Sequence, residues 1–308
     1  MQYDSNTGPF AATRTPGQQS GMAAGSFGIG IDFGTTNSAA AVFDGQHVTL
    51  VSLEKDQVIM ASASYIDRDL QTCTGQEAID TYIAMNQGRK VELSAEVLGE
   101  ARTSTGQVDP DTRLPTAADT HLVYGQSFVD ASLPGRLFRG TKRLLGNAGI
   151  QRILVFDRPF RLVALITPIL LRIRQSVEST LQRLTGSKDT QAMAAHACIG
   201  HPVNFEGRQT NHNQLAMQRL AEAYEYAGIT SQGFYPEPTA AALSYLFQQP
   251  RDQSNVVLTV DFGGGTLDLC ILQRREEYFD VAAIHGVALG GDHLDQCLFR
   301  KLLFPLLG

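Results

Sequence analysis

The sequence predicts an α/β fold built from two similar lobes with a cleft between them. Apolar runs that suit β-strands alternate along the chain with amphipathic stretches that suit α-helices, which is typical of α/β architecture. One short motif also occurs twice, as I-D-F-G-T-T-N-S at residues 31–38 and as V-D-F-G-G-G-T-L at residues 260–267. A duplicated loop suggests duplicated lobes, and ligands of α/β proteins tend to bind between such units.

The first copy of this motif is typical of a β-hairpin whose turn can hold an anion. Apolar runs on both sides of the turn predict strands, and Asp32 stands at the end of the first of them. Gly34 lets a ligand approach the backbone closely, and Thr35, Thr36 and Asn37 add polar donors. Successive backbone N–H groups in such a turn form an anion-binding concavity. Phosphate binding is therefore expected here.

The second copy repeats this arrangement with three consecutive glycines, Gly263, Gly264 and Gly265, followed by Thr266. Asp261 occupies the same place in this copy as the acid that ends the first strand. Mg²⁺ bound to phosphate keeps several waters and takes only one or two carboxylates. Two acids that face each other across a cleft would therefore suit a polyphosphate and its Mg²⁺.

A single copy of the motif would favour an ordinary tight hairpin turn. Two aligned copies, each between apolar runs, favour phosphate binding instead. The glycines lead into strands rather than helices, so the pattern differs from the Rossmann fingerprint. No G-x-x-x-x-G-K-[ST] segment is present, so it also differs from the Walker A loop.

Hydrophobic periodicity and turn residues predict the remaining elements. Besides the second motif, strands are expected at residues 28–33, 38–44, 47–53, 62–66, 192–200 and 278–288, with a short run from Phe234. Helices are expected at residues 76–85, 208–227, 239–247 and 292–303, and a longer one from Pro159 to Gly186. Residues 88–134 are polar and weakly periodic, which indicates a variable subdomain or surface excursion, and residues 250–254 indicate a turn.

Composition argues against several functional classes. A net charge of −6 over 308 residues gives no general attraction for DNA or anionic lipid, so no nucleic-acid partner is expected. No run of about 18 apolar residues and no apolar signal core occur, so no membrane partner is expected. Residues 1–26 are rich in Gly, Ser, Thr, Gln and Ala, which predicts a disordered leader.

The cysteines and histidines do not indicate a zinc site. Cys73, Cys198, Cys270 and Cys297 include no C-x-x-C pair, and Cys198 and Cys270 fall in strands that are expected to be buried. The seven histidines show neither H-x-x-H nor H-E-x-x-H spacing. Buried free thiols suit a reducing cytosol, so a cytoplasmic location is expected.

Together, the two motifs resemble the two phosphate loops of the superfamily that contains actin, sugar kinases and heat-shock chaperones. Two further segments resemble the seventy-kilodalton heat-shock (DnaK-type) chaperones. Residues 235–245, Y-P-E-P-T-A-A-A-L-S-Y, resemble their E-P-T-A-A-A segment, and residues 286–295, G-V-A-L-G-G-D-H-L-D, resemble L-G-G-x-D-x-D. Residues 197–205, A-C-I-G-H-P-V-N-F, are similar to V-P-A-x-F and look more like divergent YegD-type homologues. The resemblance runs in order over residues 27–308.

The resemblance implies an actin-like ATPase (ribonuclease-H-like) fold that binds ATP or ADP with Mg²⁺, with hydrolysis left open. It implies a first lobe over residues 27–190, including the variable subdomain at 88–134, and a second lobe over residues 191–308. In the family the nucleotide lobe continues further, so the chain is expected to be truncated. Unfolded polypeptide clients or co-chaperones would bind through the regions that follow.

The resemblance also implies catalytic roles. Residues 140–146, G-T-K-R-L-L-G, resemble the family's A-K-R-L-x-G, which makes Lys142 the lysine that reaches the terminal phosphate and the attacking water. Glu237 precedes a proline at a strand-to-helix junction, where a carboxylate would hold that water. An acid at this place also suits a helix N-terminus. The candidate catalytic residues are Lys142, Glu237 and Asp261.

Further positions follow from the same resemblance. Asp268 would support the metal site, and Gly290 and Gly291 would admit the nucleotide's sugar or phosphates closely. Pro202 matches the family's switch proline, but His201 stands before it where the family usually has valine. The candidate metal ligands are Asp32, Asp261 and Asp268.

Three other functions stay open on the sequence. One is an actin-like filament or scaffold protein, which the E-P-T-A-A-A and L-G-G-x-D-x-D matches argue against. Another is a small-molecule kinase of the same superfamily, for which no substrate-pocket acid is located. The third is a nucleotide-free pseudo-chaperone that acts only as a binding module.

Overall fold

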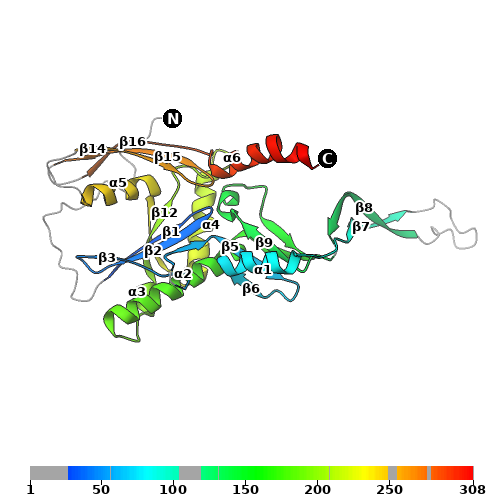
Figure 1. Ribbon diagram of the computed structural model, residues 1–308, viewed down its shortest axis with the longest axis horizontal. Coiled ribbons are helices and arrows are strands. Elements are labelled where there is room, and N and C mark those ends of the chain that lie inside the picture. Colours follow the sequence, from blue (N-terminus) through cyan, green and yellow to red (C-terminus); the bar gives the residue numbers. More distant parts are fainter. Residues whose placement is uncertain are drawn as a thin grey trace, which may run out of the picture.

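The computed structural model describes residues 27–55, 57–103, 119–130, 132–207, 209–248, 255–275 and 279–307. Within them, a large body is built on a six-stranded mixed sheet, and a smaller sheet has three strands (Figure 1). A two-stranded ribbon, β7 (Leu93–Thr103) with β8 (Asp119–Asp130), projects from the body in the segment predicted to be a surface excursion. The predictions for residues 1–26 and 250–254 lie outside the described residues.

The larger sheet joins strands that are far apart in the sequence. Its order is β13–β12–β1–β2–β3, with β4 also paired to β2. Its strands are β1 (Gly28–Phe33), β2 (Asn37–Phe43), β3 (Val48–Leu50), β4 (Ile59–Ala61), β12 (His196–His201) and β13 (Ser231–Pro236). β1 and β2 form the predicted antiparallel hairpin, whereas β12 runs parallel to β1 and to β13. The carboxyl ends of these three parallel strands therefore meet at one edge, where α/β sheets bind ligands.

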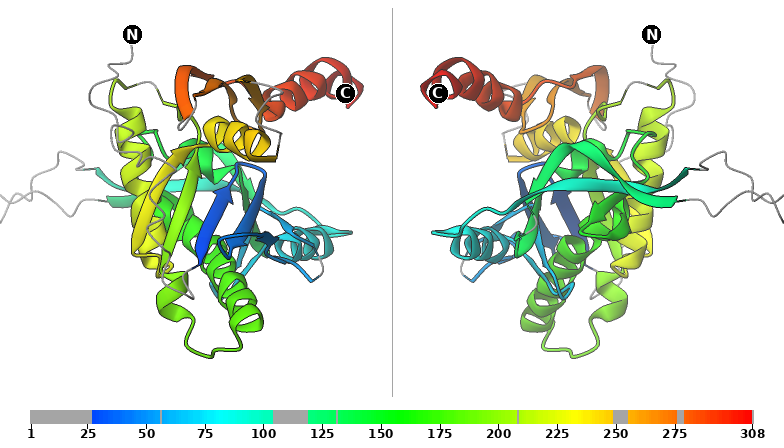
Figure 2. Two further views of the ribbon diagram at one scale, coloured as in Figure 1. Left: turned by 90° about the vertical axis from the view of Figure 1, so that its left-hand side faces the viewer. Right: turned by 90° about the vertical axis from the view of Figure 1, so that its right-hand side faces the viewer.

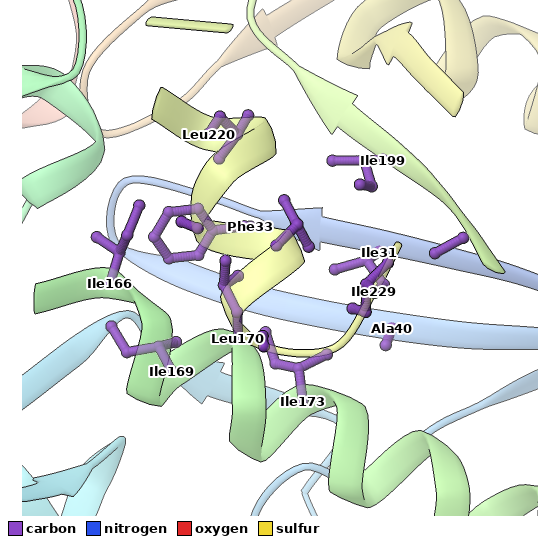
Figure 3. Packing of buried hydrophobic residues seen from close by; sticks show 14 of the residues in the cluster. Ile31, Phe33, Ala40, Ile166, Ile169, Leu170, Ile173, Ile199, Leu220 and Ile229 are labelled. Atoms are coloured by element: carbon purple, nitrogen blue, oxygen red, sulfur yellow. The ribbon is translucent and has the colours of Figure 1, made fainter. Parts of the chain in front are cut away.

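The main core includes one face of this sheet and two helices, α2 (Leu162–Thr185) and α4 (His212–Tyr226) (Figure 3). α2 buries residues three and four positions apart, including Ile166, Ile169 and Ile173, as the sequence periodicity predicts. Ile31 and Phe33 of β1 belong to the same cluster. Because burial of such a side chain stabilises the fold by roughly 1.5–3 kcal/mol, this core fixes the position of the first loop.

The start of α2 differs from the prediction, while its end agrees with it. Pro159 lies in strand β11 (Arg158–Arg161), which pairs with β10 (Arg152–Val155), and the helix begins at Leu162. Its C-cap is Gly186, whose φ of 69° is the left-handed conformation that glycine adopts without strain. Pro159 therefore belongs to the hairpin that precedes the helix and does not begin the helix.

The smaller sheet is antiparallel, in the order β14 (Val256–Phe262), β15 (Leu267–Arg274) and β16 (Phe279–Val287). β14 and β15 are the hairpin predicted from the second motif, and α6 (Gly291–Leu298) follows β16. Helix α5 (Glu237–Gln248) lies between the two sheets (Figure 2). Ala242 and Leu246 of α5 form a second core with Cys270 and Leu272 of β15.

The two sheets divide the chain at a different place from the predicted lobes. β12 and β13 follow residue 190 yet belong to the larger sheet, so that sheet crosses the boundary predicted between residues 190 and 191. The strand predicted at residues 192–200 is also shorter, because α3 (Gln191–Ala194) precedes β12. Cys198 is exposed rather than buried, since strand alternation turns it away from the neighbouring core residue Ile199.

A third sheet has the strand order β6–β5–β9. It consists of β5 (Ala63–Asp67), β6 (Thr72–Thr74) and β9 (Gly135–Arg139), and helix α1 (Gln76–Asn86) packs on it. A 3₁₀ turn, Thr141–Leu144, follows β9 directly. Among the described residues, no helix is both long and apolar enough to cross a membrane.

Candidate functional site

The two repeated loops line the same cavity, of about 210 Å³, although more than 220 residues separate them in the sequence. The turn between β1 and β2 forms one wall, and the turn between β14 and β15 forms another. The segment that follows β12, the residue that follows β13 and the 3₁₀ turn complete the lining. Twelve of the predicted residues line it: Asp32, Gly34, Thr35, Thr36, Asn37, Lys142, Glu237, Asp261, Gly263, Gly264, Gly265 and Thr266.

The two loops approach each other so closely that glycine is required in the second. A Cβ on Gly264 would lie 2.2 Å from Thr36 Oγ1, and a Cβ on Gly265 would lie 3.0 Å from Thr35 Oγ1. Separations below 3.0 Å between such atoms force a neighbour to move, so a side chain at residue 264 would push the loops apart. The glycines of the second loop were predicted to allow close approach of a ligand. In the structure they already allow close approach of the first loop.

Asp32 and Asp261 bring unneutralised negative charge to this cavity. Asp32 is open to the cavity, but the surrounding protein removes most of its hydration. That burial, with added repulsion from Glu237 and Asp261 against attraction by Lys142, raises the pKa of Asp32 to about 6. Burial and the charge of Glu237 also raise the pKa of Asp261. Both carboxylates would gain from a nearby cation.

Lys142 and Glu237 form an ion pair at the edge of the cavity. The Lys142 Nζ donates a hydrogen bond of 2.6 Å to Glu237 Oε1, and the two side chains are only 5% and 17% exposed. Lys142 lies in the 3₁₀ turn after β9, and Glu237 is the first residue of α5, directly after β13. Gly200 of β12 leaves room for the glutamate, because a Cβ there would lie 3.0 Å from Glu237 Cγ. The pair places a flexible cation and a carboxylate beside both loops.

Asp268 does not line the cavity and lies behind the second loop. Its side chain is buried, and its oxygens accept hydrogen bonds from the Val203 backbone N–H at 3.2 Å and from Thr266 Oγ1 at 3.0 Å. Burial is the main cause that raises the pKa of Asp268 to about 6. This position suits a residue that fixes the loop and the neighbouring chain rather than one that reaches a ligand directly.

Gly290 and Gly291 also lie outside the cavity lining and attach α6 to the second loop. The Gly291 N–H donates to the Gly263 carbonyl at 3.0 Å, and the Asp292 N–H donates to the Gly264 carbonyl at 3.0 Å. A Cβ on Gly290 would lie 2.3 Å from the Gly264 carbonyl oxygen. Glycine is therefore needed at residue 290 for the contact between the two backbones, whereas a Cβ on Gly291 would lie no closer than 3.8 Å to the Gly263 carbonyl oxygen.

Two charged residues of the cavity, Arg143 and Glu206, were not predicted from the sequence as site residues. They pair with each other across the lining, and Arg143 also contacts Asp292 of α6. The basic Lys142–Arg143 dipeptide was a signal for the arginine, whereas nothing in the sequence around Glu206 indicated its partner. Pro202 lines the cavity as well, and the preceding His201 is half-buried, with its Nδ1 2.8 Å from the Pro202 carbonyl oxygen.

The donor set can hold Mg²⁺ but does not form a complete metal cage. In the part of the chain that the structure describes, no group of three or more His, Cys, Asp or Glu side chains is arranged to hold a metal. The cavity offers the carboxylates of Asp32 and Asp261 and the hydroxyls of the threonines. Oxygen donors with only one or two carboxylates match the preference of a phosphate-bound Mg²⁺, which keeps several waters.

Comparison with known protein families gives a match to part of the chain. Residues 166–304 match the family model described as Hsp70 protein. The matched span begins within α2 and includes Glu237, the second loop and Gly290, but neither the first loop nor Lys142. Over these residues the chain is similar to the Hsp70 family, and this similarity suggests an actin-like ATPase fold. The mixed α/β sheets are consistent with that fold.

Proposed function

We propose that this chain is the nucleotide-binding part of an Hsp70-type chaperone and that its cavity binds ATP or ADP together with Mg²⁺. The observation that carries the proposal is the cavity itself, which gathers two glycine–threonine loops, two strand-end carboxylates and a lysine–glutamate pair. Polypeptide clients and co-chaperones are the partners that the Hsp70 match suggests. The cytoplasm is the compartment we expect.

Phosphate recognition is assigned to the two loops. Both turns line the cavity with glycine and threonine residues, and hydrogen bonds from Thr266 to Asp268 and from the start of α6 to Gly263 and Gly264 hold the second loop in place. Preorganised donors of this kind bind anionic oxygens without having to reorganise on binding. We assign Gly34 to Asn37 and Gly263 to Thr266 to the phosphates, and Gly290 and Gly291 to support of the second loop.

Metal binding is assigned to Asp32 and Asp261, with Asp268 in support. The two cavity carboxylates have raised pKa values because of burial and the negative charge of Glu237, so a nearby cation would relieve an unfavourable charge. When bound, Mg²⁺ would neutralise negative charge on the phosphate oxygens. The role of Asp268 is to keep Thr266 and the chain at Val203 in position.

Hydrolysis is assigned to Lys142 and Glu237, with Asp261 as the third catalytic candidate. The lysine supplies positive charge beside the loops, and the glutamate can accept a hydrogen bond from a water that attacks the terminal phosphate. The 2.6 Å contact between them fixes both side chains before any ligand enters. Transfer of a phosphoryl group to water depends chiefly on such positioning and charge stabilisation.

Replacing either cavity aspartate is expected to weaken Mg²⁺-dependent binding without unfolding the chain. Asp32→Asn and Asp261→Asn should each lower ADP affinity in Mg²⁺ by about tenfold or more, because a contact to a charged group is worth roughly 1.5–3 kcal/mol. Calorimetric titration with ADP, in Mg²⁺ and in EDTA, measures this. Unchanged Mg²⁺ dependence in both variants would reject the metal assignment.

Thermal unfolding provides the control on stability. Because the folded-state pKa of Asp32 is raised to about 6, its protonated form stabilises the fold at low pH, and that contribution is lost as pH rises through about 6. Asp32→Asn should therefore keep or raise the melting temperature at pH 7. Asp44→Asn is the matched control, since Asp44 accepts backbone hydrogen bonds in the turn after β2 and lies outside the cavity.

A further inference from the structure

Arg143 lies in the cavity with its charge already compensated. Its Nη2 donates to Glu206 Oε2 at 3.2 Å, its Nε donates to Glu206 Oε1, and its Nη1 lies 3.4 Å from Asp292 Oδ2. The Arg143 and Glu206 side chains are 19% and 24% exposed, so the pair is partly shielded from water. Two parallel N–H···O contacts are the geometry in which a guanidinium binds a carboxylate or a phosphate equally well.

The position of this arginine is that of a phosphate-binding group. A Cβ on Gly265 would lie 3.1 Å from Arg143 Cγ, so the arginine stem rests against the second loop. The residue also follows Lys142 directly in the 3₁₀ turn, and both line the cavity. An anion held by the loops would therefore come close to the guanidinium and would compete for the donors that Glu206 now occupies.

Glu206 is free to give up this contact. It lies in the connection between β12 and α4, and among the described residues its carboxylate is hydrogen-bonded to Arg143 alone. Asp292 is held differently, because its own backbone N–H is bonded to the Gly264 carbonyl. Glu206 can thus swing away without breaking another hydrogen bond of its side chain, while Asp292 remains with the loop.

We propose that Glu206 is an internal competitor of the ligand: it occupies Arg143 while the cavity is empty, and a phosphate group of the nucleotide displaces it. This inference rests on the proposed function and adds a residue that sets affinity. Binding must break the Arg143–Glu206 contact, so the apparent affinity is lower than the intrinsic affinity by the fraction of molecules with a free guanidinium. Release is favoured because the carboxylate returns to the arginine.

Substitutions of the two partners of this ion pair are expected to change the nucleotide affinity in opposite directions. Glu206→Gln should tighten binding of ADP and of pyrophosphate, each with Mg²⁺, by about fivefold or more, the factor expected if four-fifths of the molecules hold the pair. Arg143→Ala should weaken binding of both. In the double variant, Glu206→Gln should add little, because the guanidinium that it releases is absent. Calorimetry on the full chain measures all four proteins.

A matched control separates this effect from general loss of charge. Glu222 of α4 makes a similar two-contact pair with Arg161, at 2.7 and 2.8 Å, outside the cavity. Glu222→Gln removes the same charge and should leave both affinities unchanged. Melting temperatures confirm that each variant is folded, and Glu206→Gln preserves the size of the side chain.

The possible results separate this inference from the proposed function. If the wild type binds and Glu206→Gln binds equally well or more weakly, the inference is overturned and the proposed function is not. Equal tightening in the Arg143→Ala background would also overturn it, because Glu206 would then act only by repelling the ligand. Binding by Glu206→Gln but not by the wild type would support it. Binding by none of the proteins would refute the proposed function and this inference together.

Discussion

Glu237→Gln is expected to lower ATP hydrolysis by about 10²–10⁴-fold, the usual cost of removing one positioned acid or base. Lys142→Ala is expected to do the same. ATP affinity should change much less in both variants, because neither residue belongs to a phosphate loop and each matters most where charge develops during transfer. Single-turnover measurement of phosphate release, beside calorimetric affinity, separates the two quantities.

The two substitutions differ in their structural side effects. Glu237→Gln keeps the size of the side chain, whereas Lys142→Ala leaves the carboxylate of a largely buried pair without its partner and should lower stability. The matched control is Glu178→Gln, since Glu178 is also 17% exposed and pairs with Arg174 at 2.8 Å on α2. Turnover equal to wild type in Glu237→Gln and Lys142→Ala would refute their catalytic roles and favour a pure binding module.

Gly290→Ala is expected to separate α6 from the second loop. The new Cβ would lie 2.3–2.6 Å from three backbone atoms of Gly264 and Gly265, which cannot rotate away as a side chain can. The backbone of Gly290 is extended, so the cost is one of overlap and not of its own conformation. We expect the free energy of unfolding to fall by about 1–3 kcal/mol, as for other overpacked sites.

Gly290→Ala should lower the rate of ATP turnover more strongly than its modest loss of unfolding free energy would suggest. A 1 Å misplacement of a positioning group typically costs about 10²-fold in rate, and the second loop would move by at least part of that distance. Chemical denaturation and ATP turnover measure the two effects. Gly30→Ala is the control, because no atom lies within 4 Å of a Cβ added there. Equal behaviour of the two variants would show that the contact between α6 and the loop is unimportant.

Features set by neighbouring residues could be predicted from the sequence. Both motif hairpins and the buried face of α2 follow from periods of two and three to four residues, which the chain displays locally. Gly186 marked the end of α2 for the same reason. Both candidate loops were therefore correctly predicted as turns between strands, although the sequence does not show how the two loops contact each other.

Features set by distant pairing could not be predicted in this way. The sequence carries no local sign that β12 and β13 join β1, so the predicted boundary at residues 190 and 191 missed the extent of the larger sheet. Glu206 is 63 residues from Arg143, and no spacing rule links them. The sequence also carried no sign that Gly290 packs against the backbone of the second loop. Each of these depends on which segments meet in three dimensions.

We infer that the two repeated loops and their aspartates form one Mg²⁺-dependent nucleotide site. Calorimetric titration of the wild-type chain with ADP, once in Mg²⁺ and once in EDTA, tests it most directly. We expect one ADP to bind per chain in Mg²⁺, with an affinity weaker by about tenfold or more in EDTA because a contact to a charged group is lost. Absence of binding in both buffers, or equal binding in both, would contradict it.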